Sequence, residues 1–254
     1  MADSDITTYA GTCEKHGDFT GEAIEFFGKP IRRGCPDCAE ERRKKEIAEE
    51  AAKAEAKAKR EAEADKQRLR KSGVPLRFET KTLEAFSAKN DRQQIALSAC
   101  KRLVESIRAG EQGANLIFIG KPGTGKSHLA CGIILALYRS HRVCRIDLPD
   151  LIREIRATWS RKAEHTEAEV LDYFGELDLL IIEEIGTGAG SEDEKARIFQ
   201  VINRRYEAML PTILVSNFDL KALEQEIGSR VLDRLREGDR AVLTFDWPSM
   251  RGSV

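Results

Sequence analysis

The sequence has few aromatic residues and no long apolar run. Aromatic residues make up 6% of the 254 residues, and the longest apolar run, residues 129–138, is ten residues long. About 20 apolar residues are needed to span a bilayer, so this run excludes a membrane span and fits a core helix. The opening MADSDITTYA lacks a basic segment followed by an apolar one, so it does not form a secretory signal. We therefore expect a cytoplasmic protein.

The chain also has almost no net charge, because 42 Lys and Arg residues face 43 Asp and Glu residues. Charge alone therefore neither indicates nor excludes a nucleic-acid partner. With 41% hydrophobic residues the chain can form a buried core, and the scarcity of aromatics fits an α/β core of aliphatic side chains. The length predicts one α/β domain and a smaller module.

Residues 39–71 lack glycine and proline and consist largely of the helix formers Ala, Glu, Lys and Arg. Ile47 and Leu69 are their only large apolar residues, so the seam of a coiled coil is missing. We predict an exposed helix about 50 Å long, either a semi-rigid spacer or a partner-binding surface. Glutamates precede lysines by four positions in Glu40/Lys44, Glu41/Lys45, Glu49/Lys53 and Glu55/Lys59.

The six cysteines fall into two groups. Cys13-x-x-His16 and Cys35-x-x-Cys38 are two paired-ligand knuckles separated by eighteen residues, which predicts one tetrahedral Zn²⁺ in a small module; unligated thiols are the alternative. The other cysteines lie in helix or strand patterns and are predicted to be buried thiols: Cys100, Cys131 and Cys144. The predicted organisation is a zinc module at 1–38, a helical linker at 39–72 and an α/β domain at 73–254.

Short apolar strands alternate with helical patterns from residue 115 onward, which predicts a parallel sheet covered by helices. Most of these strands lack strict alternation, as strands buried on both faces do. The five predicted strands are 115–119, 143–148, 179–182, 212–216 and 241–245.

Residues 120–127 read GKPGTGKS between an apolar strand and an amphipathic helix, which is the pattern of a phosphate-binding P-loop. Lys126 is expected to reach the β- and γ-phosphates of ATP, and the Ser127 hydroxyl to ligate Mg²⁺. The residues predicted to contact the nucleotide are Gly120, Lys121, Pro122, Gly123, Thr124, Gly125, Lys126, Ser127 and His128.

The run DLLIIEE at 178–184 resembles a Walker B motif, which supplies a second acid to the same Mg²⁺. Glu183 stands where the motif usually has Asp, so it is predicted to approach the metal and Glu184 to polarise the attacking water. The extra methylene of Glu183 either reaches the metal through water or slows hydrolysis. Asn217 ends the strand expected between the two Walker strands, and its amide is predicted to sense the γ-phosphate.

Arg230 and Arg234 lie one helical turn apart and are predicted to contact the γ-phosphate of a neighbouring subunit, the alternative being a helix that faces solvent or DNA. Nine residues follow Phe245, so we expect no C-terminal helical lid, and Arg251 is the one late candidate for a sensor arginine.

The segments RFETKTLEAF, GKPGTGKSHLA, DLLIIEEIG, LVSN, GSRVLDRLR and FDWPSMR occur in this order from residue 77 onward. Together they resemble the DnaC family of helicase loaders, with the related IstB transposition ATPases close behind. The resemblance implies an AAA+ P-loop fold and an ATP-regulated oligomer that delivers a DnaB-type replicative helicase to single-stranded DNA. It also implies an arginine finger acting between subunits. The zinc segment departs from chromosomal DnaC and resembles phage-type relatives.

Two helical patterns between 149 and 174 resemble the insertion of initiator-type relatives. Four basic residues there are predicted to follow a single-stranded backbone: Arg153, Arg156, Arg161 and Lys162. Trp159 could stack on a base, but its helical spacing from Ile152 and Ile155 favours a core position.

Three functions fit the sequence: a helicase loader, an IstB-type transposition helper that remodels duplex DNA, and a non-AAA P-loop enzyme such as a small-molecule kinase. The kinase is the least favoured, because Asn217 and the arginine pair replace the lid and acceptor residues that a kinase needs. A nucleotide-locked domain that does not hydrolyse ATP is a further possibility, because Glu183 replaces the usual Asp.

Overall fold

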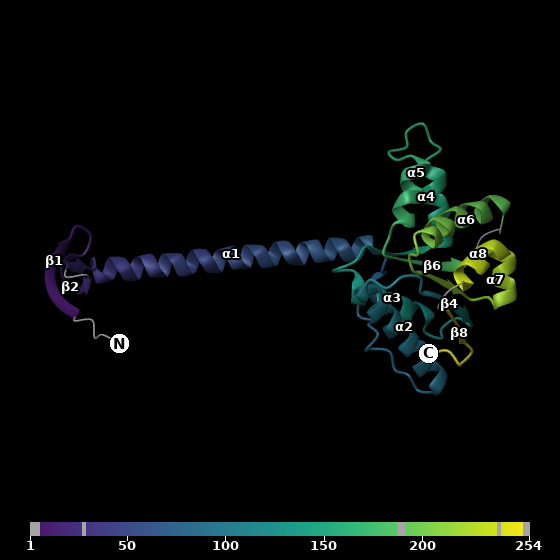
Figure 1. Cartoon of the computed structure of the whole chain (residues 1–254), viewed down its shortest axis with the longest axis horizontal. Helices are drawn as coiled ribbons and strands as arrows, with labels where there is room; N and C mark the ends of the chain where they lie inside the picture. The colour runs from purple at the N-terminus through teal and green to yellow at the C-terminus, as the bar shows by residue number, and fades with distance from the viewer. Residues whose placement is uncertain (1–5, 27–28, 187–190, 238–239, 251–254) are drawn as a thin grey trace. The chain divides into compact units, whose positions relative to one another are not determined.

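The computed structural model describes residues 6–26, 29–186, 191–237 and 240–250 of the chain (Figure 1). The chain divides into two compact units, Met1–Ala64 and Asp65–Val254. Within the described residues, no helix is long and apolar enough to cross a membrane. Arg251 lies outside the described residues, so its predicted sensor role has no structural account.

The first unit contains a small antiparallel sheet of strands β1 (Ile6–Cys13), β2 (Gly17–Phe26) and β3 (Lys29–Arg32), in the order β1-β2-β3. Gly17 closes the β1–β2 hairpin with a φ of 75°, a conformation that glycine adopts without strain. Few of the described side chains here are buried, and β3 is exposed along its whole length. This sheet therefore lacks a substantial apolar core.

The predicted linker forms one helix, α1 (Pro36–Lys71), none of whose residues is buried. Of the expected Glu–Lys pairs, Lys44–Glu40 forms at 2.7 Å, whereas Glu41 contacts Lys15 and His16, and Lys45 pairs with Glu49. The last turns of α1 belong to the second unit, where Asp65 pairs with Arg139 and Leu69 packs against the core.

The second unit contains a five-stranded parallel sheet in the order β5-β6-β7-β4-β8. This confirms the predicted parallel sheet, and β7 does lie between the two Walker strands, β4 and β6. The strands are β4 (Asn115–Gly120), β5 (Val143–Asp147), β6 (Leu179–Ile185), β7 (Thr212–Ser216) and β8 (Arg240–Phe245).

Helices cover both faces of this sheet and bury one apolar core on each (Figure 1). One core is formed with α2 (Asp91–Ala109) and α3 (Lys126–Leu137), which follow the short helix η1 (Leu76–Phe78) in the sequence. The other core is formed with α4 (Leu148–Ala157), α5 (Glu167–Gly175), α6 (Glu192–Glu207), α7 (Leu220–Ile227) and α8 (Ser229–Arg236). Cys100, Cys131 and Cys144 are buried as predicted, and burial raises the pKa of each thiol.

One buried arginine ties several of these elements together. Arg205 of α6 is 1% exposed and donates to the carbonyl oxygens of Phe174, Leu177 and Pro211 and to the Thr212 hydroxyl. Burial lowers the pKa of Arg205 to about 9. A guanidinium has enough donors to satisfy all of these acceptors, so this buried charge connects α5, α6 and β7.

Candidate functional site

The P-loop connects β4 to α3 and is shaped by glycines that have no room for a side chain. A Cβ on Gly120, whose φ is 127°, would lie 2.3 Å from the carbonyl oxygen of Phe245 on β8. Gly125 caps α3 with a φ of 98°, and a Cβ there would lie 2.7 Å from the Phe86 ring. The loop backbone is therefore fixed between β8 and Phe86, and the N-terminus of α3 opens directly from it, a geometry suited to an anion.

Lys126 is the first residue of α3 and is only 6% exposed. Its ammonium donates to the carbonyl oxygens of Gly120 at 2.6 Å and Lys121 at 2.8 Å, and the Thr124 hydroxyl donates to Lys121 at 2.8 Å. The carbonyl oxygens of the loop thus surround the Lys126 ammonium, at the place where the motif predicts phosphate contacts.

The structure brings the P-loop serine and the Walker B carboxylate together. Ser127 donates to Glu183 Oε2 at 2.8 Å, although the two residues are 56 positions apart in the sequence. Glu183 is 2% exposed, and its Oε1 is buried without a hydrogen-bond partner among the described residues. A hydroxyl beside an ionisable carboxylate is an oxygen donor set suited to Mg²⁺.

Arg145 of β5 is a component of this site that sequence analysis did not identify. Its guanidinium donates to Asp147 at 2.7 Å and to Glu183 Oε2 at 3.3 Å. Burial acts to lower the pKa of Arg145, but the charges of Glu183 and Asp147 raise it above its ordinary value. The one sequence signal was a cation inside the otherwise apolar start of a strand, VCRID.

Glu184, predicted to polarise water, has an unusual backbone. Its φ is 53°, in the left-handed region of backbone conformation that residues other than glycine rarely adopt. The register of β6 against β7 also shifts between Ile182 and Ile185. The Ser216 hydroxyl donates to the Ile185 carbonyl oxygen at 3.1 Å on the far side of this irregularity. The bulge directs Glu184 to an exposed position while Glu183 stays buried. Asn217 follows Ser216 directly and is also exposed.

A C-terminal segment covers the other side of the loop. The Trp247 indole N–H donates to the Thr124 carbonyl at 2.8 Å, and the Met250 amide donates to the Gly123 carbonyl at 2.7 Å. His128 points toward the segment between η1 and α2. There its Nε2 lies 2.9 Å from the Thr82 carbonyl oxygen, and its ring contacts the Phe86 ring edge to face. Its predicted nucleotide contact stays a prediction.

The two arginines of α8 lie in different environments. Arg230 is exposed, whereas the Arg234 guanidinium lies 4.6 Å from the Phe199 ring centroid and 5.4 Å from that of Tyr206. Such stacking fixes Arg234 within its own chain. Of these two arginines, Arg230 is therefore the one exposed to solvent.

Comparison with known proteins agrees with this geometry. Residues 43–244 match the family model described as IstB-like ATP binding protein. The replicative helicase loader DnaC of Buchnera aphidicola subsp. Acyrthosiphon pisum (strain APS) is 35% identical over 187 residues, which cover 73% of this chain and 75% of the relative. The DnaC of Escherichia coli (strain K12) is 33% identical over 185 residues, 72% of this chain and 74% of the relative.

This chain belongs to the DnaC/IstB family of ATP-binding proteins. A crystal structure of the DnaC helicase loader shares its fold, with a TM-score of 0.58 and 24% sequence identity over 67% of this chain and 99% of that chain. Membership confirms the resemblance from sequence, and it makes ATP and Mg²⁺ the expected ligands of the P-loop site.

The basic residues of this DnaC/IstB chain between β5 and β6 are partly engaged within the molecule. Arg153 pairs with Asp150 at 2.7 Å, and Arg156 pairs with Asp193 at 3.0 Å. Arg161 and Lys162 are exposed in the turn between α4 and α5. Two of the four residues predicted to follow a single strand are therefore paired with acids of the same unit, and the other two are exposed.

The favoured core position of Trp159 is wrong. Its side chain is 54% exposed, its indole N–H donates to Glu167 at 2.9 Å, and the Arg197 guanidinium lies 5.1 Å from the ring centroid. The helical spacing from Ile152 and Ile155 does not extend to Trp159 because α4 ends at Ala157.

The predicted zinc ligands lie together in the first unit, outside the part that matches the family model. Their ligand atoms are all within 4.8 Å of one another. The Cys13 and Cys38 sulfurs are 3.6 Å apart, and His16 Nδ1 lies 3.3 to 3.8 Å from the three sulfurs. A tetrahedron with Zn–S of about 2.3 Å and Zn–N of about 2.0 Å has edges of about 3.8 and 3.5 Å, so the residues fit Zn²⁺.

The surroundings of this cluster also suit a metal. Backbone hydrogen bonds at Lys15 and His16 lower the pKa of Cys13 to about 6, which favours its thiolate, whereas the hydrogen bond to Cys13 raises the pKa of Cys38 to about 11. His16 Nε2 lies 3.2 Å from Glu41, the arrangement in which a carboxylate orients a ligating imidazole. Sequence analysis predicted the four Cys and His residues of this cluster but did not identify Glu41.

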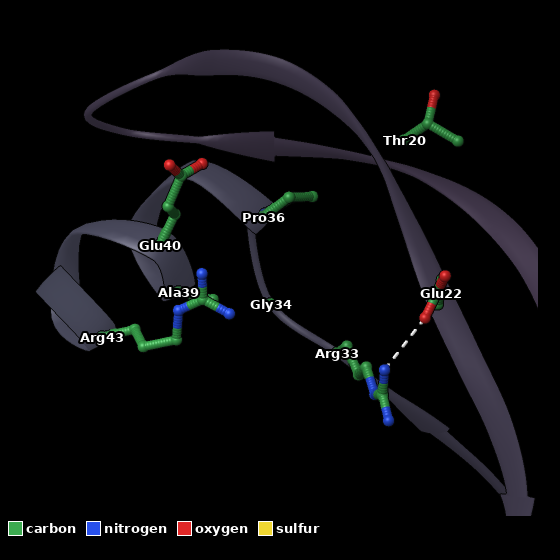
Figure 2. Close-up of a pocket in the computed structure, with 8 residues that line it drawn as sticks. All are labelled: Thr20, Glu22, Arg33, Gly34, Pro36, Ala39, Glu40 and Arg43. Atoms are coloured by element: carbon green, nitrogen blue, oxygen red, sulfur yellow. Dashed lines mark hydrogen bonds and ion pairs between the residues drawn. The ribbon is translucent and has the colours of Figure 1, made fainter.

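A cleft of about 460 Å³ lies between β2 and the start of α1 (Figure 2). Two of its charged residues are arginines, Arg33 and Arg43, and two are glutamates, Glu22 and Glu40. Arg33 pairs with Glu22 at 3.0 Å across one side of the cleft, as the dashed line in Figure 2 shows. With both signs of charge, the lining favours neither an anionic nor a cationic ligand.

Proposed function

We propose that this protein is an ATP-dependent loader that delivers a DnaB-type replicative helicase to single-stranded DNA and works as an oligomeric AAA+ switch. The observation that carries the proposal is the Ser127–Glu183 contact beside a compact P-loop, in a chain whose relatives at 33–35% identity are named replicative helicase loaders. The test is capture of purified replicative helicase on the immobilised full chain with ATP, ADP or no nucleotide. Absence of capture in every state would refute the loader function.

ATP hydrolysis in this proposal uses residues already in place. Lys126 exchanges its bonds with loop carbonyls for the β- and γ-phosphates, and Glu184 polarises the attacking water. Ser127 and Glu183 would hold Mg²⁺, which would neutralise charge on the phosphates. Lys126→Ala is expected to abolish nucleotide binding and turnover, whereas Lys101→Ala, which removes an exposed lysine of α2 outside the P-loop, should retain both. Equal turnover in wild type and Lys126→Ala would contradict this assignment.

Arg230 is proposed as the residue that acts between subunits, with Arg234 supporting α8 through its aromatic neighbours. Arg230→Ala should lower ATP turnover while leaving ATP affinity and the melting temperature unchanged, because the arginine contacts only the neighbour's nucleotide. Arg234→Ala should lower the melting temperature as well, because Phe199 and Tyr206 lose their packing partner. A mixing experiment separates the roles, since a subunit with intact Arg230 should restore turnover to a neighbour that lacks it.

Single-stranded DNA is proposed to bind along Arg153, Arg156, Arg161 and Lys162. The double variant Arg161→Gln/Lys162→Gln is the cleaner test, because these exposed residues have no ion pair among the described residues, whereas Arg156→Gln also breaks a pair with Asp193. The logarithm of the binding constant falls linearly with the logarithm of the salt concentration, and loss of two phosphate contacts should make this slope shallower by about 1.4 for a single strand. An unchanged slope would exclude these two residues from the DNA path.

We further propose that Cys13, His16, Cys35 and Cys38 bind one Zn²⁺. Elemental analysis of the purified chain should find one zinc per chain, and its loss on Cys38→Ser would assign the site. A protein purified without zinc that also fails to take it up would refute this part.

The second candidate function is that of an IstB-type transposition helper, favoured by the family model itself. Such a protein would bind duplex DNA in the presence of ATP and stimulate a transposase, and it would not retain a replicative helicase. Duplex binding and helicase capture measured side by side distinguish the two functions.

A further inference from the structure

Two acids and one arginine meet where β5 lies beside β6. Asp147 pairs in register with Glu183, and Arg145 stands two residues before Asp147 on the same face of β5. Like charges at neighbouring positions on paired strands repel each other. The Arg145 guanidinium reduces this repulsion because it contacts both carboxylates, Asp147 at 2.7 Å and Glu183 at 3.3 Å.

Glu183 needs such a partner because it is buried. Its side chain is 2% exposed, and a buried carboxylate loses most of its hydration unless a cation and hydrogen bonds replace the water. The cation is Arg145, and the hydrogen bond comes from Ser127. Both contacts fall on Oε2, so they fix one oxygen and leave the other, Oε1, buried with no hydrogen-bond partner in the described part of the chain.

This arrangement addresses the extra methylene of Glu183. A glutamate has one more rotatable bond than the aspartate usual at this position, so it has more orientations to lose when it holds a metal shell. We propose that Arg145 is a positioning residue of the metal site, whose guanidinium contacts Glu183 Oε2 and holds this carboxylate in one orientation toward Ser127. This inference rests on the proposed ATPase function, since it concerns the Mg²⁺ of that site.

The backbone of Arg145 is itself held from outside the sheet. Its amide donates to the Ser72 carbonyl at 2.8 Å, and the buried Ser72 hydroxyl donates to the Leu69 carbonyl at 2.7 Å within the last turn of α1. A Cβ on the next residue, Gly73, would lie 1.9 Å from the Arg145 carbonyl oxygen. The end of α1 therefore fixes the main chain of the residue whose guanidinium fixes Glu183.

The test measures metal binding separately from turnover. Mn²⁺, which reports on a Mg²⁺ site by electron paramagnetic resonance, is titrated into the full chain loaded with a non-hydrolysable ATP analogue. Loss of groups that orient metal ligands typically lowers metal affinity at least tenfold, so Arg145→Met is expected to weaken Mn²⁺ binding by about tenfold. Analogue affinity without metal should stay the same, because the P-loop contacts are intact.

Arg142→Met is the matched control, because Arg142 directly precedes β5 and faces Glu176 at 3.8 Å instead of the metal site. It should leave Mn²⁺ affinity unchanged. Arg145→Lys keeps the charge but replaces a planar fork with a single ammonium, so it should weaken Mn²⁺ binding less than Arg145→Met does. In a Glu183→Asp background, Arg145→Met should lower Mn²⁺ affinity by a smaller factor than it does in the wild-type background, because the shorter acid has fewer orientations to restrict.

Unchanged or tighter Mn²⁺ binding in folded Arg145→Met would overturn the inference, because an arginine that merely competes with the metal would give tighter binding. If Arg145→Met does not fold, Arg145→Lys decides in the same way, and wild-type Mn²⁺ affinity there overturns the inference. Failure of the wild-type chain to bind the analogue at all would refute the proposed ATPase function instead.

Discussion

The two units of this chain are stabilised in different ways. In the unit that ends at Ala64, β3 is wholly exposed and few described side chains are buried, whereas β6 and β7 in the second unit are buried almost throughout. Burial of apolar surface dominates folding energy, and a small module without it needs another source of stability. The proposed zinc site at Cys13, His16, Cys35 and Cys38 would supply that source in the first unit, so folding there is expected to depend on metal.

The largest expected effect is the loss of the small sheet when the metal ligands are removed. Binding free energy of a structural zinc is folding free energy, so Cys38→Ser or a strong chelator should abolish amide protection in β1 and β2. The second unit should keep its melting temperature and nucleotide binding. Hydrogen exchange measured by mass spectrometry follows both units in one sample. Protection of β1 and β2 that persists without metal would break the comparison.

A matched pair of glutamates tests the same site more gently. Glu41→Gln removes the carboxylate bonded to His16 and should lower zinc affinity by about 10-fold or more. Glu40→Gln, next in the chain but paired with Lys44, should leave zinc affinity unchanged. Equal affinities in the two variants would show that Glu41 has no part in the metal site.

The next effect concerns the buried guanidinium of Arg205 in the second unit. Arg205→Met should destabilise it by roughly 3–5 kcal/mol, because the carbonyls of Phe174, Leu177 and Pro211 lose a buried charged partner. Urea unfolding monitored by circular dichroism measures this loss. Arg204→Met, which removes a more exposed pair with Asp172, should change stability by about 1 kcal/mol or less. Similar losses in both variants would mean that burial does not set the cost.

A smaller effect separates steric clash from backbone strain at two glycines. Gly73 and Gly110 have nearly equal φ angles, 73° and 72°, but only a Cβ on Gly73 would meet another atom, the Arg145 carbonyl oxygen. Gly110→Ala should cost about 1 kcal/mol for the left-handed conformation alone. Gly73→Ala should cost more and lower the thermal midpoint further. Equal midpoints would mean that the end of α1 moves away from β5 at little cost.

The smallest effect is a pH dependence from His128. Burial lowers the pKa of this imidazole below its ordinary value of 6.5, so the unfolded chain binds more protons than the folded one around that pH. Stability should therefore fall as pH drops through about 6.5. His128→Gln should reduce this slope, as measured by thermal melts between pH 7.5 and 5.5 in steps of about half a unit. An unchanged slope would assign the pH dependence to other groups.

Much of the site was predictable because its parts are local patterns. GKPGTGKS, the strand before Glu183 and the Cys-x-x-His and Cys-x-x-Cys knuckles each place their chemistry within a few residues, and a parallel sheet brings strand ends to one edge. Arg145 and Glu41 were missed because their roles depend on partners 38 and 25 positions away. Trp159 was misplaced because helical periodicity does not reveal where a helix ends.

The sequence by itself predicted the five strands of the parallel sheet, the P-loop, the proposed zinc ligands and the exposed helix α1, because these follow from local propensity and spacing. Only the tertiary structure decided which charges meet. It placed Arg145 between Asp147 and Glu183, stacked Arg234 on two aromatic rings and left Arg230 exposed. Strand order and helix packing set these distances, and neither is written in any single segment of the chain.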